Sequence, residues 1–273
     1  MSAQSPVSRK DVQDLFSQAG LTPASTEIVV NNLYASAAAL AACQGDNPLS
    51  LGSTEGVIVK FVIDKSGSMQ EVEVEVPKAI LEAVSAMNEA KQSVAITLSV
   101  LAFSDDVSVL FANRAVDGIT QNDIPFYASG RTALYDAVMD ALTGALKYEE
   151  EQLNAGMTTK VIVVVFSDGA DNASTRADIS KIAQLTKDLK KRENWILAFV
   201  GFKTYEAGRG TDYMQIARDM GFNALLEIDL SDPDVYKRRH VIRGVFQLVS
   251  KSVIRKSQTA IDPKNPAAGF LTT

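Results

Sequence analysis

Residues 57–63 are the feature that most constrains the fold. They are mostly β-branched or aromatic and apolar on both faces, which is typical of a central strand in a parallel sheet. The strand ends at Asp64, and Ser66 and Ser68 follow, with Gly67 between them to let the loop turn tightly. Ligands of open α/β sheets bind just beyond such strand ends. The sequence therefore places three oxygen donors where donors can converge.

Strand and helix patterns alternate along the rest of the chain. The spacing has the length of crossover connections and predicts a doubly wound, mostly parallel, six-stranded α/β sheet of the Rossmann-like type. The tight turn at 104–106 predicts that the strand after it is an antiparallel edge strand. The expected strands are 57–63, 94–103, 107–111, 159–166, 195–202 and 224–229, and the expected helices are 77–91, 132–147, 177–191, 212–220 and 233 to about 253.

The remaining segments flank this domain. Residues 1–52 are interpreted as two helices and a linker, an N-terminal helical hairpin that props the main domain rather than a separate functional unit. Residues 53–255 form the main domain. Residues 256–273 are polar, contain two prolines and are expected to be a flexible tail.

Composition excludes several classes of function. The chain has 273 residues, a net charge of −6, one cysteine and one histidine. One cysteine rules out an internal disulfide framework, and one histidine nearly excludes a histidine-based zinc site or a Ser-His-Asp triad. The net charge offers no general reason to bind nucleic acid or an anionic membrane. The basic run 237–240 is interpreted as a solvated helix face.

The expected location is the cytoplasm, without membrane attachment. No early apolar run resembles a signal peptide. Residues 28–42 are apolar but too short to span a bilayer, and Asn31 and Asn32 interrupt them. The alternative is a lipoprotein processed at Cys43, since residues 40–43 resemble a bacterial lipoprotein cleavage box. Its distance from the start, Glu27 and the two asparagines argue against that processing.

Two further motifs join the first. Thr132 opens a helix after a glycine-containing turn, and Asp168 follows the apolar strand 159–166. If that strand neighbours strand 57–63, both carboxylates lie at one switch point of the sheet. Two acids and three hydroxyls are hard oxygen ligands, which suit Mg²⁺ or Mn²⁺. Because only two of the ligands are charged, the ion would stay electrophilic and could accept an Asp or Glu side chain of a partner at an open position.

Three stretches carry a family resemblance: Asp-Lys-Ser-Gly-Ser-Met at 64–69, Gly-Arg-Thr-Ala-Leu-Tyr-Asp at 130–136 and Phe-Ser-Asp-Gly at 166–169. Together they resemble the von Willebrand factor A family and its metal-ion-dependent adhesion site. The likeness covers about residues 55–255 and looks closest to bacterial intracellular members. Arg131 departs from the second glycine usual in those members, and it is expected to change the conformation of the loop that carries Thr132 or to add a positive charge beside the metal.

The resemblance implies roles for the five residues. Ser66 and Ser68 would bind the metal directly, and Thr132 would bind directly in a ligand-competent state and through water otherwise. Asp64 and Asp168 would bind directly or through water and orient the hydroxyls. The implied function is that of a non-enzymatic adaptor that binds a protein partner, such as an AAA+ ATPase of the MoxR type or a stress-response complex.

Other interpretations stay open at this point. Taken singly, the motifs are a helix cap and turn, an N-cap at Thr132 and an ordinary turn at 168–169, and Asp136 and Asp171 are solvated or capping groups. A Mg²⁺-dependent phosphatase-like hydrolase would use Asp64, but its general acid two residues later is replaced by Ser66. A structural subunit would use the metal only to make a loop rigid.

Overall fold

The computed structural model describes residues 8–90, 94–168, 171–203, 212–260, 262 and 264–272. Its centre is one sheet with the strand order β3-β2-β1-β4-β5-β6. Every neighbouring pair is parallel except β2 and β3, which are antiparallel at one edge. The predicted fold class is therefore confirmed. The strands are β1 (Glu55–Asp64), β2 (Ala95–Phe103), β3 (Val107–Ala115), β4 (Thr158–Ser167), β5 (Trp195–Lys203) and β6 (Ala224–Asp229).

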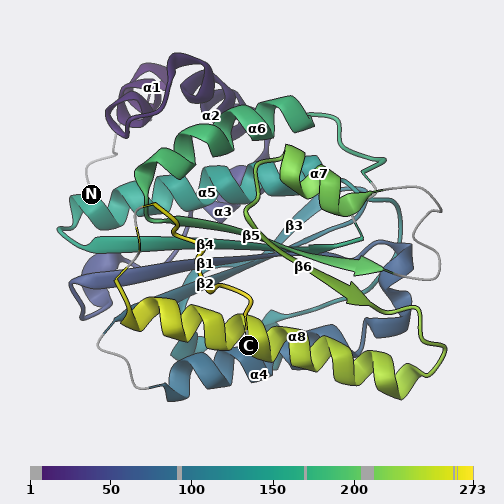
Figure 1. Ribbon diagram of the computed structural model, residues 1–273. Coiled ribbons are helices and arrows are strands. Elements are labelled where there is room, and N and C mark those ends of the chain that lie inside the picture. Colours follow the sequence, from purple (N-terminus) through teal and green to yellow (C-terminus); the bar gives the residue numbers. More distant parts are fainter. Residues whose placement is uncertain are drawn as a thin grey trace.

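Helices cover both faces of the sheet (Figure 1). The helices α4 and α8 lie on one face, and α5, α6 and α7 lie on the other, with α1 to α3 packed on that side as well. The main helices are α4 (Glu75–Glu89), α5 (Leu134–Asn154), α6 (Ile179–Leu189), α7 (Tyr213–Asp219) and α8 (Val235–Gln258). Short 3₁₀ turns are η1 (Pro48–Ser50), η2 (Gly67–Val72), η3 (Val116–Gly118), η4 (Gln121–Asp123) and η5 (Lys190–Arg192). Among the described residues, no helix is both long and apolar enough to cross a bilayer.

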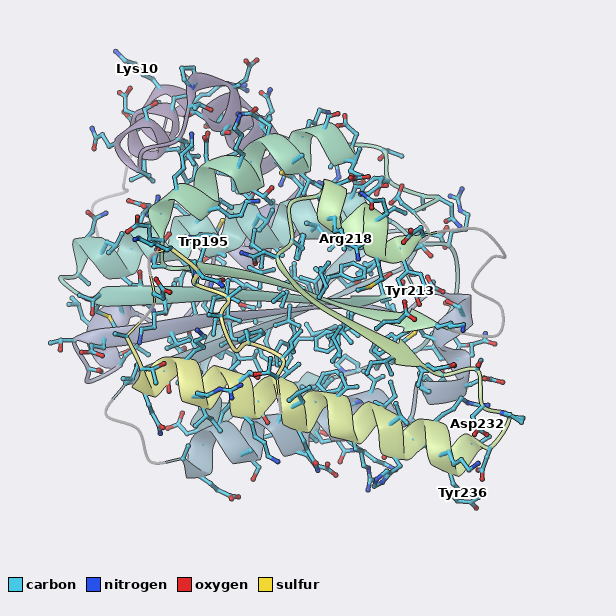
Figure 2. The ribbon with its side chains drawn as sticks, in the orientation of Figure 1. Lys10, Trp195, Tyr213, Arg218, Asp232 and Tyr236 are labelled. Carbon is cyan, nitrogen blue, oxygen red and sulfur yellow. The ribbon has the colours of Figure 1, made fainter. Side chains whose placement is uncertain are left out.

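Two apolar layers hold these elements together. On the α8 face, the rings of Phe166 and Phe246 stack with centroids 4.5 Å apart, and Phe61 packs edge-on against Phe166. On the opposite side of the sheet, Trp195 is fully buried and its indole nitrogen donates a 3.0 Å hydrogen bond to Glu149 (Figure 2). Burial of such large side chains supplies most of the apolar stabilisation of a domain of this kind.

The N-terminal region differs from the predicted pair of helices. From residue 8 to residue 52 the structure describes three: α1 (Arg9–Gln18), α2 (Pro23–Ala35) and α3 (Ala37–Ala42). Ser36 separates the last two because its backbone is extended, with φ −125° and ψ 116°, and its side chain accepts a hydrogen bond from the Ala39 amide. A serine at this position therefore ends one helix and caps the next.

The C-terminal segment corrects a second expectation. Helix α8 begins at Val235, after its N-cap Asp234, rather than at 233 as expected, and it continues to Gln258. Beyond it, Phe270 and Leu271 are buried in the same apolar layer as α4 and α8, and the Leu271 amide donates to the Ser252 hydroxyl. The prediction of a flexible tail over residues 256–273 is therefore wrong for the residues that the structure describes. Its apolar side chains pack with those of α4 and α8 in one buried cluster.

A lysine lies inside the sheet. Lys60, on β1, is fully buried, and its ammonium donates to Ala42 O at 3.1 Å, Ser99 Oγ at 2.8 Å and Asn113 Oδ1 at 2.7 Å. The Asn113 amide in turn donates to the carbonyls of Ala42 and Gln44. A buried ammonium with three oxygen acceptors has every proton hydrogen-bonded. These bonds attach the end of α3 to the centre of the sheet.

Candidate metal centre

The site forms where β1 and β4 run side by side. These strands are parallel, with Ile63 opposite Phe166, so the end of β1 meets the end of β4 at one edge of the sheet. Asp64 ends β1, and Asp168 follows the last residue of β4. From β1 the chain passes to β2 and β3 on one side, and it then returns to β4 on the other side of β1, which makes this edge a topological switch point. The predicted neighbourhood of the two strands is confirmed.

Asp64 is buried and held rigidly. One carboxylate oxygen accepts a 2.8 Å hydrogen bond from the Ser66 amide, and the other accepts a 2.6 Å bond from the Ser167 hydroxyl. Burial and the nearby charge of Asp168 raise the pKa of Asp64 to about 6, although these hydrogen bonds oppose the shift. Two carboxylates close together and out of water favour a cation between them.

The two serines lie on the turn that follows. Ser66 is buried, Ser68 is partly exposed, and their hydroxyl oxygens are 3.1 Å apart. Ser66 occupies the N-cap position of η2, but its side chain makes no capping hydrogen bond. The capping interpretation of Ser66 is therefore wrong, and its hydroxyl is turned toward Ser68 instead.

Thr132 lies on a loop that is bonded to this turn. The Gly67 amide donates to the Gly130 carbonyl at 3.1 Å, and the Ser129 amide donates to the Lys65 carbonyl at 2.8 Å. Gly130 has φ +81°, a backbone conformation that residues with a Cβ rarely adopt, so the turn favours glycine. Helix α5 begins at Leu134 with Ala133 as its N-cap. Thr132 is therefore not the cap of that helix, contrary to the simplest interpretation.

The positive charge of Arg131 is neutralised by Asp105. Its guanidinium Nε lies 2.8 Å from Asp105 Oδ1, and its amide donates to the other carboxylate oxygen. Both side chains are more than half exposed. The residue that departs from the family pattern thus brings its own counter-charge, and it braces the loop that carries Thr132.

Asp168 completes the set from the third loop. It is 4% exposed, and its Oδ1 atom is buried without a hydrogen bond from any described residue. The same loop returns to Thr132, since Asn172 accepts from the Thr132 amide at 2.8 Å and the amides of Asn172 and Ala173 donate to the Thr132 carbonyl. Gly169, the second residue of the predicted Asp-Gly motif, lies outside the described residues.

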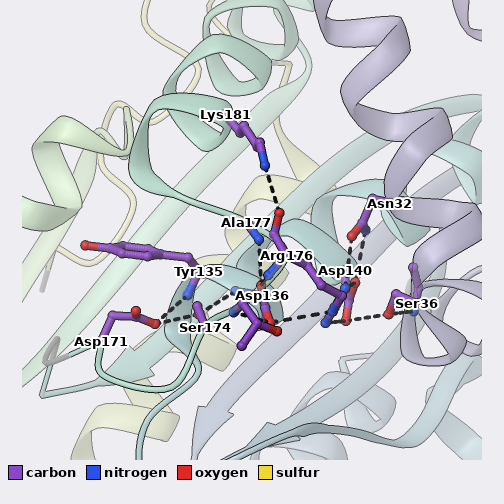
Figure 3. Close-up of polar contacts among 12 residues, drawn as sticks. Asn32, Ser36, Tyr135, Asp136, Asp140, Asp171, Ser174, Arg176, Ala177 and Lys181 are labelled. Carbon is purple, nitrogen blue, oxygen red and sulfur yellow. Dashed lines mark hydrogen bonds and ion pairs between the residues drawn. The ribbon is translucent and has the colours of Figure 1, made fainter.

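A layer of acidic side chains fixes this third loop (Figure 3). Asp136 is 4% exposed and accepts hydrogen bonds from the amides of Thr175, Arg176 and Ala177. Asp171 accepts from the Tyr135 amide and the Ser174 hydroxyl. Asp171 thus caps an amide in the first turn of α5, as predicted, whereas Asp136 is buried and bonds loop amides, so it is neither solvated nor a helix cap.

The donor set fits a small divalent cation. It offers two carboxylates and the hydroxyls of Ser66, Ser68 and Thr132, and one buried carboxylate oxygen of Asp168 has no other partner within the part of the chain that the structure describes. No group of three or more His, Cys, Asp or Glu residues in the described part of the chain could hold a metal instead. Partly exposed Ser68 leaves the set open to solvent on one side. Such an arrangement can bind a hard cation and present it outward.

Sequence reasoning missed two residues that orient these ligands. Ser167 holds the Asp64 carboxylate, and Asn172 holds the Thr132 backbone. Both are polar residues within four positions of Asp168, and that closeness was the available signal. Their partners are far away in the sequence and could not be named without the fold.

Residues 59–232, more than half of the chain, match the sequence model of a family described as the von Willebrand factor type A domain. No curated protein matches the chain.

Solved structures resemble the fold at low identity. The pilus adhesin SpaC from Lactobacillus rhamnosus GG, in an open conformation, has a TM-score of 0.53 at 11% identity, over 74% of this chain and 30% of that one. The PilB minor pilin from Streptococcus sanguinis has a TM-score of 0.46 at 14% identity, over 74% and 62%. Proximal thread matrix protein 1 from the mussel byssus, with a zinc-occupied MIDAS motif, has a TM-score of 0.42 at 13% identity, over 72% and 47%. The chain spans less than two thirds of each of these proteins.

Proposed function

Because this chain belongs to the von Willebrand factor type A domain family, we propose that it is a metal-dependent protein-binding module and not an enzyme. The observation that carries the proposal is the buried Oδ1 atom of Asp168, which has no partner among the described residues and lies beside a second buried carboxylate. A buried acceptor without a donor is costly in a folded protein. A bound cation would satisfy it.

The five predicted residues have different roles at this site. Ser66 and Ser68 are the direct ligands in our proposal, because the capping bond that would otherwise occupy Ser66 is not formed. Thr132 is the third hydroxyl ligand, and Asp64 and Asp168 supply the negative charge and orient the hydroxyls. When bound, Mg²⁺ or Mn²⁺ supplies an electrophilic position for one external oxygen.

The external oxygen is best supplied by a carboxylate. The set carries only two negative charges, so it does not repel an incoming Asp or Glu as a site with three or four carboxylates would. We propose that a partner protein offers this acidic side chain. The partner that we would look for first is an AAA+ ATPase of the MoxR type or a stress-response complex, and we propose that the capture takes place in the cytoplasm.

Capture of a partner tests the proposal. Pull-downs from lysate in Mg²⁺ or in EDTA should recover a protein only in Mg²⁺, and Thr132→Ala should abolish the recovery with little change in melting temperature. Thr158→Ala is the matched control, since Thr158 is an exposed threonine at the opposite end of β4. Recovery of the same protein in EDTA, or its loss in both variants, would contradict the proposal.

Two alternatives have their own signatures. Hydrolysis of a generic phosphate ester that disappears in Asp64→Asn would favour a phosphatase-like enzyme. A purely structural metal would change the melting temperature without any metal-dependent partner.

A further inference from the structure

A cationic and aromatic surface lies next to the metal-binding edge. The N-terminal turns of α8 lie against η2, the turn that follows the two serines, and Arg238 forms a 3.1 Å ion pair with Glu71 there. Continuing along α8, the residues Tyr236, Arg239, His240 and Arg243 recur at helical spacing and share one face. With Glu75 and Lys78 of α4 they line a hollow of about 270 Å³. We call these six residues the α4–α8 surface.

Positive charge is in excess on this surface. Glu75 is almost fully buried, and its carboxylate is engaged at 2.5 Å by the Nε of Arg243. Arg239 and Lys78 reach the same carboxylate only at 3.9 and 4.0 Å, and they are 39% and 48% exposed. Arg239 makes no hydrogen bond to any described residue, so its planar donor group can take a further carboxylate.

Exposed apolar side chains accompany the charge. Tyr236 is 80% exposed at the outer end of α8 (Figure 2), Val74 is 54% exposed just before α4, and Val235 is 38% exposed. A second hollow of about 490 Å³ adjoins the first, with Lys78 in the lining of both. The apolar part of its lining comes from Val74, Pro77, Ile124, Pro125 and Phe126. Large apolar groups beside a partly exposed arginine are typical of interface centres.

From this juxtaposition we propose that the α4–α8 surface binds an acidic segment of the protein partner, one that carries an aromatic or aliphatic side chain among its carboxylates. The occupant follows from charge complementarity, because the surface is cationic in a chain whose net charge is −6. That net charge disfavours nucleic acid as the occupant. The inference rests on the proposed function, since it gives the partner a second contact beside the metal.

A model peptide tests the inference. The probe is a short fluorescein-labelled polyglutamate peptide with one central phenylalanine, and its binding is measured by fluorescence anisotropy in low salt with Mg²⁺ present. The double substitution Lys78→Gln/Arg239→Gln should weaken binding about fivefold. This is the combined effect expected for the loss of two exposed charge-assisted contacts. It leaves the Arg243–Glu75 pair intact, so the fold should be retained. Tyr236→Ser should weaken binding of this peptide but not of a pure polyglutamate peptide.

The control has the same change in charge. Lys187→Gln/Arg218→Gln removes two exposed cations from α6 and α7, which lie across the sheet from α8 (Figure 1). Equal weakening by both double variants, or stronger binding of a single-stranded oligonucleotide than of the peptide with the same dependence on Arg239, would overturn the inference.

Binding measurements with and without Mg²⁺ also separate this inference from the proposed function. Ser68→Ala should remove only the part of the binding that depends on Mg²⁺. If the Arg239 effect persists while Mg²⁺ has no influence, the metal site fails as a partner contact and the surface stands. If Mg²⁺ matters and the Arg239 substitution does not, the surface is overturned.

Discussion

At the scale of single residues, Lys60 has the least expected environment. The strand pattern correctly placed it on a buried strand, but it could not show that oxygens from α3, β2 and β3 would surround the ammonium. Burial lowers the pKa of Lys60 from 10.5 to about 7, with a small opposing effect from Cys43. The protonated form is therefore harder to keep in the folded protein than in the unfolded chain.

This shift has a consequence for the pH dependence of stability. Between pH 7 and 10.5 the unfolded chain keeps a proton on Lys60 that the folded protein has lost, so the free energy of unfolding should rise with pH. The slope is at most about 1.4 kcal/mol per pH unit. Urea unfolding from pH 7 to pH 9 should show the rise in the wild type and in Lys251→Met, an exposed control, but not in Lys60→Met. An equal slope in Lys60→Met would contradict it.

At the scale of elements, the loops that carry the site were more predictable than the segments that support it. Apolar runs ending in Asp or Ser located Asp64 and Asp168 because buried strands and their ends have strong local signals. The break at Ser36 was hidden in a run whose other residues, alanine and leucine, are strong helix formers. The burial of Phe270 depends on packing against α8, which no local pattern in a polar segment reveals.

The N-terminal helices are joined to the third loop through one buried carboxylate. Asp140, on α5, is fully buried and accepts from Asn32 and Ser36 of the N-terminal region and from both terminal nitrogens of Arg176 (Figure 3). Because Arg176 also donates to Asn32, the network links α2, α5 and the loop after β4.

Breaking this network should loosen the N-terminal helices first. Asp140→Ala removes a buried acceptor from a charged pair, which we expect to lower the free energy of unfolding by about 3 kcal/mol. Hydrogen exchange should increase in α2 and α3 more than in β4. Asp117→Ala, at an exposed aspartate, should change stability by less than about 0.5 kcal/mol. Uniform loss of protection across the sheet would argue against a local attachment.

At the scale of the whole molecule, the metal and the fold should be thermodynamically linked. A cation that binds only the folded protein stabilises it by about 2.7 kcal/mol at one hundred times its dissociation constant. For a chain of this size that corresponds to a rise in melting temperature of about 5 °C.

One substitution separates the ligand role of Asp168 from a structural one. Asp168→Asn removes a buried charge beside Asp64, so the melting temperature without metal should stay the same or rise, while the increase on adding Mg²⁺ or Mn²⁺ should disappear. Differential scanning calorimetry of both proteins with metal and with EDTA measures this. A lower melting temperature in EDTA, with the metal effect retained, would show that Asp168 supports the fold and does not bind the cation.

The hydrogen bonds of Lys60 also bear on where this protein can be divided. The carbonyl of Ala42 accepts from the buried ammonium, and the carbonyls of Ala42 and Gln44 accept from Asn113, so these peptide groups do for the sheet interior what water does at a surface. If residues 8–52 were removed, water would have to enter the centre of the sheet to replace these carbonyl acceptors. The helices that precede β1 therefore supply hydrogen-bond acceptors to the interior of the sheet. In this chain the domain of the family thus depends on a segment that the family pattern does not include.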